Sequence, residues 1–244
     1  MKLGKTMFAA LALVAGAPVA MAGTTVVTFD NGAEGWVGPG GPGGATVIDA
    51  AGGNPGANMH TVFNDFGITF SNTTNPAFVQ DLTQYASVTI SIDLKANLTE
   101  FFFQPVTRPW VLELRDFDQP GPDNPFYSSV FFKFSDVGMS GWTTWSVTID
   151  NPQSAGLPAG WGGSGDVDGN FEPILPAGVT FESILAGYDE IAFTTLQPGF
   201  FFGFTDFDWQ IDNISITTVP IPAPGALALL GVSGVMLRRR RRTN

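Results

Sequence analysis

The sequence predicts an all-β fold, a single β-sandwich of the jelly-roll type. Only 14% of the 244 residues are charged while 44% are hydrophobic, against roughly 25% charged residues in ordinary soluble domains. The chain contains 30 glycines, 18 prolines and 22 phenylalanines, a composition that favours strands joined by many turns. No long segment repeats apolar residues at the helical period of 3.6. Several short strands with turn-rich connectors are typical of a sandwich or jelly roll.

The chain begins with the features of a signal peptide over residues 1–22. Lys2 and Lys5 precede an apolar run at 7–17, and Ala20 and Ala22 supply the small residues that signal peptidase requires. The apolar run is too short to span a membrane as a mature helix. We therefore expect export through the Sec system with cleavage after Ala22.

Period-two alternation predicts strands along the body, residues 23–218. Apolar and polar residues alternate strictly over 88–95 and again over 144–149, as in strands with one buried face. Less regular strands are expected over 24–29, 110–117, 127–134 and 190–195.

The last strand carries a change of parity. Phe207, Trp209 and Ile211 occupy odd positions, whereas Ile214 and Ile216 occupy even ones. Because alternate side chains of a strand face opposite sides, both groups reach one core only if a residue is inserted between them. The sequence therefore predicts a β-bulge near residues 212–213.

Glycine and proline mark the connectors between the expected strands. Turn-rich segments lie at 38–44, 52–56, 120–125 and 152–169, and at most one helical turn is expected, at 182–186. No internal repeat or composition shift divides residues 23–218, so one domain is predicted. Trp36 and Trp145 are expected in its core.

The C-terminal segment 219–244 combines a proline-rich lead, a short apolar stretch at 225–237 and a basic cluster. Its motif residues are Val219, Pro220, Pro222, Ala223, Pro224, Gly225, Arg238, Arg239, Arg240, Arg241 and Arg242. This order resembles the PEP-CTERM sorting tail of proteins processed by an exosortase. Pro222-Ala223-Pro224 departs from the usual Pro-Glu-Pro of that family.

The resemblance implies a Gram-negative-type bacterium that makes extracellular polysaccharide. It further implies that the tail enters the inner membrane transiently and is removed or transferred by the exosortase, which leaves the body in the cell envelope or the extracellular matrix. An ordinary C-terminal membrane anchor is the alternative, with the arginines held on the cytoplasmic side.

The body is strongly acidic. It holds all 22 acidic residues but only four basic ones, Lys95, Arg108, Arg115 and Lys133, so its formal net charge is −18. Such a surface repels phosphate backbones, which excludes nucleic acid as an expected partner. The acidic residues either attract calcium or only keep the surface solvated.

Composition removes several kinds of catalysis. The chain has no cysteine and one histidine, His60, which excludes disulfides, thiolate metal sites and any site with two imidazoles. No Gly-x-Ser-x-Gly motif is present, and His60 lies in an expected strand as a structural residue. Asp116, Asp118 and Glu113 beside Arg115 are expected to be solvated or salt-bridged. We therefore expect no enzyme activity and assign no catalytic residue.

The body as a whole is similar to laminin-B-like modules and, more loosely, to galactose-binding-like jelly rolls and carbohydrate-binding modules. The segments that carry the resemblance are 29–30, 34–36, 52–56, 85–95 and 211–214. The resemblance implies a jelly roll that binds glycans.

Two phenylalanine triplets are the candidate ligand-binding aromatics. They are Phe101, Phe102 and Phe103, and Phe200, Phe201 and Phe202. Adjacent side chains of an extended segment face opposite ways, so the three rings of a triplet cannot all point into one core. Exposed rings could stack on sugars or meet a partner, and the alternative is that these loops pack over the open end of the sandwich.

A structural calcium is the cofactor considered, at Asp30 and Asp212. In a jelly roll the first and last strands lie close together, which could bring these carboxylates to one edge. The resemblance to carbohydrate-binding jelly rolls implies a structural calcium at such a place, and calcium takes six to eight oxygen ligands. The alternative is that each aspartate only accepts local backbone hydrogen bonds.

These observations lead to one functional prediction and two alternatives. The protein is expected to be an exported, non-enzymatic protein of the cell surface or extracellular matrix whose jelly roll binds glycan, with extracellular polysaccharide as partner. The alternatives are a polysaccharide-active hydrolase and a purely structural surface module without a ligand.

Overall fold

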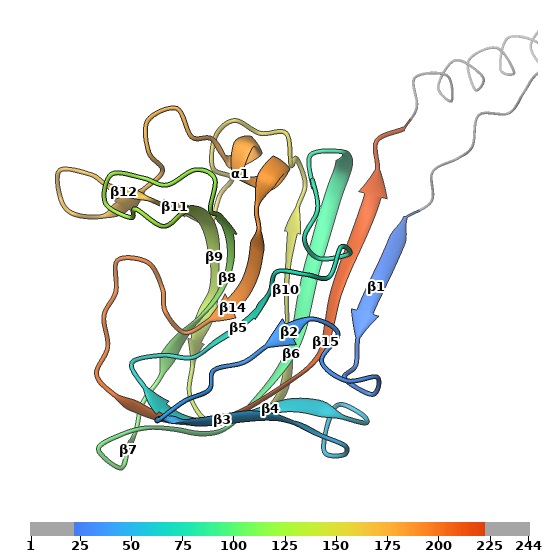
Figure 1. Ribbon diagram of the computed structural model, residues 1–244, viewed down its shortest axis with the longest axis vertical. Coiled ribbons are helices and arrows are strands. Elements are labelled where there is room, and N and C mark those ends of the chain that lie inside the picture. The colour runs from blue at the N-terminus through green and yellow to red at the C-terminus, as the bar shows by residue number, and fades with distance from the viewer. Residues whose placement is uncertain (1–21, 223–244) are drawn as a thin grey trace, which may run out of the picture. The chain divides into compact units, whose positions relative to one another are not determined.

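A computed structural model describes residues 22–222, which fold as two antiparallel β-sheets packed face to face (Figure 1). This confirms the predicted all-β, jelly-roll sandwich. Residues 1–21 and 223–244 lie outside the described residues, and with them Ala20 and the tail motif from Ala223 onward.

The first sheet, called sheet A, contains the chain's two longest strands at its centre. Its main order is β10-β6-β15-β4-β3, with β1 beside β15 and β7 beside β6. The strands are β1 (Gly23–Val27), β3 (Gly44–Asp49), β4 (Asn58–Asp65), β6 (Tyr85–Phe101), β7 (Gln104–Pro105), β10 (Ser140–Ile149) and β15 (Thr205–Pro220).

The second sheet, called sheet B, has the order β11-β9-β8-β14-β5-β2. Its strands are β2 (Trp36–Val37), β5 (Thr69–Asn72), β8 (Arg108–Asp116), β9 (Ser128–Val137), β11 (Trp161–Ser164) and β14 (Glu190–Thr194). A separate hairpin joins β12 (Asp166–Val167) to β13 (Pro173–Ile174), and α1 spans Phe181–Gly187. Thr180 caps α1 by accepting a hydrogen bond from the Ser183 amide at 3.0 Å.

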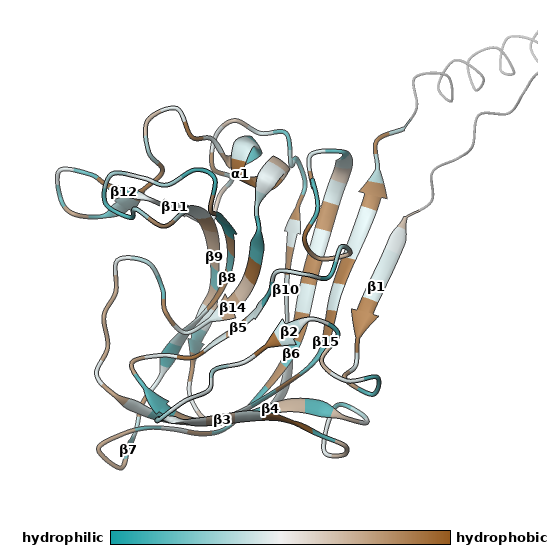
Figure 2. Cartoon of the chain, in the orientation of Figure 1, coloured by the Kyte–Doolittle hydropathy of each residue, from teal (hydrophilic) through white to brown (hydrophobic). Residues whose placement is uncertain are grey.

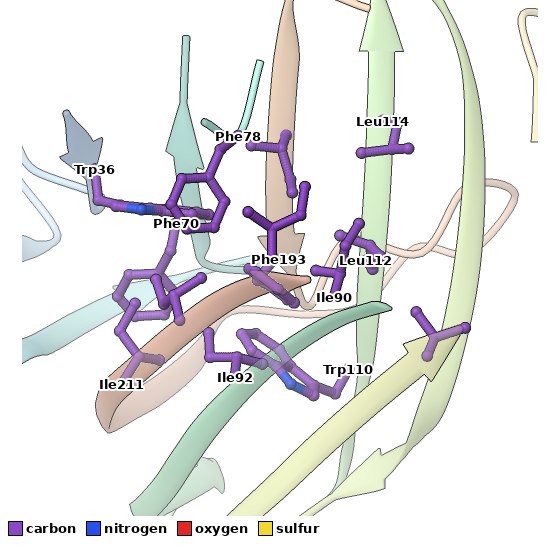
Figure 3. Packing of buried hydrophobic residues seen from close by; sticks show 14 of the residues in the cluster. Trp36, Phe70, Phe78, Ile90, Ile92, Trp110, Leu112, Leu114, Phe193 and Ile211 are labelled. Carbon is purple, nitrogen blue, oxygen red and sulfur yellow. The ribbon is translucent and has the colours of Figure 1, made fainter. Parts of the chain in front are cut away.

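The core lies between the two sheets and is built from the alternating apolar residues. Figure 2 shows brown bands alternating with pale ones along β6 and β15. Figure 3 shows side chains of both sheets meeting there, with Ile90 and Ile92 from β6 facing Trp110 and Leu112 from β8. All four are fully buried. The period-two pattern therefore selects the inward face of each sheet.

The predicted bulge in β15 is confirmed. The pairing of β15 with β6 shifts register between Asp212 and Ser215, and Asn213 there has a positive φ of 49°. Consequently Ile211 and Ile214 are both fully buried although they differ in parity. One inserted residue turns the second half of the strand back toward the core.

The structure differs from the sequence-based expectations for one tryptophan, one connector and the helix. Trp36 is 2% exposed, as predicted, but Trp145 is only half-buried, although Val147 and Ile149 on the same edge strand β10 are buried. The connector expected over 152–169 is interrupted by β11 and β12, and the helix is longer than one turn, with 7 residues. Glycine-rich strands such as β11 lack the apolar alternation that reveals other strands.

The start of the predicted tail belongs to the sandwich. Val219 and Pro220 end β15, where they pair with Ser87 and Tyr85 of β6. Within residues 22–222, no helix is long and apolar enough to cross a bilayer.

Candidate functional site

The outer face of sheet B is buried at its centre. Leu112 and Leu114 of β8 point into the core, so Val111 and Glu113, which alternate with them, point outward. Both are nevertheless at most 1% exposed, as is the outward Ala192 on the neighbouring strand β14. Burial this complete on an outward face shows that surrounding side chains cover the centre of the sheet.

A buried charged cluster forms much of this cover. Arg115 donates to Glu113 Oε2 from Nε at 2.9 Å and from Nη2 at 2.7 Å, and it also donates to Glu190 on β14. Ser129 Oγ donates to the other Glu113 oxygen at 2.6 Å. The Tyr127 ring lies 5.2 Å from the guanidinium carbon. The interpretation of Glu113 as a salt-bridged carboxylate is therefore confirmed.

Burial and neighbouring charges shift the pKa values of two members of this cluster. Burial, the largest single effect, lowers the pKa of the Arg115 guanidinium, but the charges of Glu113, Tyr127 and Glu190 and the hydrogen bond to Glu113 together outweigh burial and raise that pKa. Burial also raises the pKa of the Tyr127 hydroxyl, and the Glu113 charge raises it further.

At one end of the same face lies a hollow of about 270 Å³, called here the sheet B hollow. It brings together the ends of β8 and β9 and the loop 195–204 that leads into β15. Its lining residues are Thr107, Pro109, Lys133, Asp136, Gln197, Phe200 and Phe202.

Two phenylalanines of the second triplet form the apolar wall of the hollow. The rings of Phe200 and Phe202 are nearly parallel, with an interplanar angle of 13° and centroids 6.5 Å apart. The Arg108 guanidinium lies 4.8 Å from the Phe202 ring centroid and is itself anchored by bonds to Thr205 Oγ1 at 3.0 and 2.6 Å. These contacts hold the Phe202 ring in place.

A turn positions the other ring. Pro198 and Gly199 occupy the centre of a turn in which the Phe200 amide donates to the Gln197 carbonyl at 3.1 Å. Gly199 has a φ of +80°, which is the conformation that the third residue of a type II turn requires.

The polar wall contains an unpaired hydrogen-bond acceptor. Gln197 Oε1 is buried and has no hydrogen-bond partner within residues 22–222. Lys133 Nζ and Asp136 Oδ1 form an ion pair of 2.8 Å nearby. A buried acceptor without a donor is unfavourable by about 1–3 kcal/mol, so a donor from a bound molecule would relieve this cost.

The six predicted aromatic residues therefore separate into three groups. Phe200 and Phe202 line the sheet B hollow. Phe102, Phe103 and Phe201 project into solvent with exposed fractions of 77%, 83% and 80%. Phe101 lies against Gly203, where an added Cβ would be 2.5 Å from its ring. Each triplet thus exposes rings, as one of the two alternatives from the sequence requires.

Several lining residues escaped the sequence analysis. Lys133, Asp136 and Gln197 carry no motif and come from distant parts of the chain. The only local signal was the Pro-Gly turn immediately before Phe200, which marks Gln197 as the first residue of a turn.

Asp30 and Asp212 are brought to one place, as expected from their strand positions. Both accept hydrogen bonds from the same loop: Ala57 N donates to Asp30 Oδ1 at 3.0 Å, and Asn54 N donates to Asp212 Oδ2 at 2.6 Å. Burial raises the pKa of the Asp212 carboxyl, the amide bonds lower it, and the nearby Asp93 and Asp30 charges raise it. The net shift is upward.

Each of these two carboxylates thus uses one oxygen atom to accept a hydrogen bond from the loop 52–57. Asp212 also accepts from the Asn213 amide at 2.7 Å, which is the local backbone bond of the alternative interpretation. Across the described residues 22–222, no group of three or more His, Asp or Glu side chains is arranged to hold a metal ion. A calcium ion at Asp30 and Asp212 stays a prediction.

His60 on β4 is part of a structural bridge on the outer face of sheet A. Its Nδ1 lies 2.7 Å from Asp49 Oδ2 and its Nε2 lies 2.8 Å from Asp208 Oδ1, so it joins the neighbouring strands β3 and β15. Burial lowers the pKa of His60, but the two aspartates together outweigh burial and raise the pKa above 6.5.

We expect this bridge to make stability depend on pH. Because the folded pKa of His60 exceeds the unfolded value, its stabilisation is complete below about pH 6.5 and is lost as pH rises through the folded pKa. Urea unfolding from pH 5.5 to 8.5 should show this decline in the wild type but not in His60→Gln. An NMR titration giving the single histidine a pKa of 6.5 or lower would contradict the bridge.

Known proteins resemble this chain in structure but not in sequence. No family model matches the sequence, and no curated protein matches it either. The family 11 carbohydrate-binding module of a cellulosomal cellulase from Clostridium thermocellum is similar with a TM-score of 0.44 and 14% identity, over 83% of this chain and 97% of that one.

Two further similar structures also contain carbohydrate-binding modules. A xylan-binding domain from Paenibacillus barcinonensis has a TM-score of 0.43 and 11% identity, over 81% of this chain and 94% of that one. A xylanase of Clostridium thermocellum in complex with xylohexaose has a TM-score of 0.43 and 13% identity, over 80% of this chain. The match spans 28% of that xylanase structure.

Proposed function

We propose that this protein is a non-enzymatic glycan-binding module and that the sheet B hollow is its sugar site. The observation that carries the proposal is the buried, unpartnered Gln197 Oε1 beside the parallel rings of Phe200 and Phe202. A sugar ring presents a C–H face and a rim of hydroxyl groups. It therefore matches a wall of aromatic rings next to an unpaired acceptor.

The roles of the lining side chains follow from their chemistry. The C–H face of a sugar would pack on Phe200 and Phe202, while a hydroxyl donates to Gln197 Oε1. Lys133 offers a donor and Asp136 an acceptor on the same side of the hollow. With about 270 Å³, the hollow lies just below the range of about 300–1,000 Å³ typical of ligand pockets, which suits one sugar unit with the remaining chain outside.

Export and sorting complete the proposal. The signal-peptide pattern over 1–22 supports passage through the Sec system. The tail from Val219 to Arg242 supports processing by an exosortase after a transient stay in the inner membrane. The body would then reside in the cell envelope or extracellular matrix of a Gram-negative-type bacterium, with extracellular polysaccharide as its partner.

A glycan array probed with the purified protein tests the proposal, followed by affinity measurements on the strongest ligand. Phe202→Ala and Gln197→Ala should each weaken binding about tenfold, because one stacking contact or one hydrogen bond is worth about 1–1.5 kcal/mol. Gln197→Ala also removes the unpaired acceptor, so the variant should fold at least as well as the wild type.

The matched control is Phe126→Ala, which removes a ring that is 75% exposed near the opposite end of β8. Its affinity should equal that of the wild type. Retention of full affinity in both hollow variants, or the absence of any glycan ligand, would contradict the proposed site and favour a structural module without ligand.

A further inference from the structure

Four exposed phenylalanines lie outside the hollow on two neighbouring segments and are called here the phenylalanine crest: Phe102, Phe103, Phe201 and Phe204. Figure 1 places β7 and the start of β15, which flank these residues, at the same end of the sandwich. Phe66 connects one side of the crest, with ring centroids 5.0 Å from Phe201 and 4.1 Å from Phe204. On the other side, Phe101 packs against Gly203.

The tip of the crest adopts a backbone that phenylalanine disfavours. Phe102 and Phe103 form the two-residue connection between β6 and β7, where Phe101 pairs with Gln104. Their φ values are +49° and +61°, as a type I′ turn requires at both central positions. Asn-Gly adopts this turn without strain, whereas bulky residues rarely do. The fold alone therefore gives no reason for two phenylalanines here.

The exposure of the crest adds to this cost. Phe102, Phe103 and Phe201 are 77%, 83% and 80% exposed, and Phe204 is 52% exposed. Exposed apolar side chains gathered in one patch are typical of an interaction surface. Strain combined with exposure indicates that the rings are retained for what they contact outside this chain.

Charge is missing from both segments that carry the crest. Residues 101–107 and 196–205 contain no Asp, Glu, Lys, Arg or His, although the chain has 22 acidic residues. Charged groups are excluded most strongly from surfaces that enter a medium of low dielectric constant, because their desolvation is costly. The two segments therefore suit contact with a medium of low dielectric constant.

We propose that the phenylalanine crest inserts into the interfacial layer of a lipid bilayer. The crest protrudes as a hairpin tip, which suits penetration of a soft layer better than contact with a second copy of an acidic body that repels itself. The exposed rings of the crest offer no hydrogen-bonding groups for sugar hydroxyls. With only four basic residues in the body, the attraction must be apolar, so a zwitterionic lipid surface is the fitting partner.

Sedimentation with phosphatidylcholine vesicles tests the proposal on the purified protein. The wild type should bind, and its binding should change little between low and high salt. Adding phosphatidylserine should weaken binding at low salt, because the acidic body is repelled. The double variant Phe102→Asn with Phe103→Gly removes two rings and supplies residues that suit the turn, so it should fold well but bind vesicles at least tenfold more weakly.

Two controls separate this proposal from its rivals and from the glycan site. Phe126→Ala, an exposed ring elsewhere, and Gln197→Ala in the sheet B hollow should both bind vesicles like the wild type. Failure of the wild type to bind vesicles would overturn the proposal, as would equal binding by the double variant. A third outcome is that the wild type does not bind vesicles but associates with itself or binds glycan, and that the double variant loses this activity. The crest would then contact a second copy or a glycan, and lipid insertion would be wrong.

Discussion

Trp209→Ala should lower the free energy of unfolding by about 3–5 kcal/mol, the usual cost of removing a buried aromatic side chain. Trp209 on β15 is fully buried and meets Trp110 of the opposite sheet edge-to-face, with ring centroids 5.5 Å apart. Its Nε1 donates to the Leu98 carbonyl at 3.1 Å and to Thr99 Oγ1 at 2.9 Å. The substitution therefore opens a cavity and leaves two buried acceptors short of a donor.

Trp145→Ala is the matched comparison, because it removes the same side chain from a half-buried position at the sheet edge. A Trp145 fully buried in the core, as the sequence predicts, would lose about 3–5 kcal/mol, and its half-burial reduces the expected loss below that of Trp209. Urea unfolding followed by circular dichroism measures both. Equal losses, or a near-neutral Trp209→Ala, would contradict the position of the core.

Glu113→Ala should destabilise the fold by about 3–5 kcal/mol, because it removes one member of a buried ion pair. The Glu113 side chain is 2% exposed and that of Arg115 is 14% exposed. Among the described residues, Arg115 without Glu113 retains only Glu190 as a charged partner. The buried Ser129 hydroxyl loses its acceptor. Chemical denaturation at neutral pH measures the loss.

Asp136→Ala is the control for an exposed pair. It breaks the Lys133–Asp136 bridge, whose side chains are 36% and 54% exposed, and such pairs contribute only about 0–1 kcal/mol. If both variants lost the same small amount, the charged cluster on sheet B would not be the buried structural element that its exposure indicates.

Much of the sandwich could be predicted because its signals are local. The alternation over 88–95 identifies the centre of β6, and the parity change between Ile211 and Ile214 identifies the bulge in β15. Each follows from neighbouring residues that must reach one core. How fully one side chain of a strand is covered depends on distant residues that pack against it, which is why the half-burial of Trp145 does not follow from the sequence.

The candidate site could be predicted only in part for the same reason. The triplets at 101–103 and 200–202 were found because adjacent rings cannot all be buried in an extended chain. Which rings line the sheet B hollow depends on Lys133 and Gln197, which only the fold brings beside them. The unpaired state of Gln197 Oε1 is a property of the packed loop and leaves no pattern in the sequence.

The most direct test of the sugar site is an NMR titration of the purified protein with the strongest glycan ligand from the array. We expect the largest shift changes at the Gln197 side-chain amide and at the backbone amides of Thr107, Lys133 and Phe202, because these residues line the hollow. The amides of the loop 52–57, which Asp30 and Asp212 hold, should stay unchanged. Shift changes concentrated in that loop, with none around Gln197, would contradict the glycan site on sheet B.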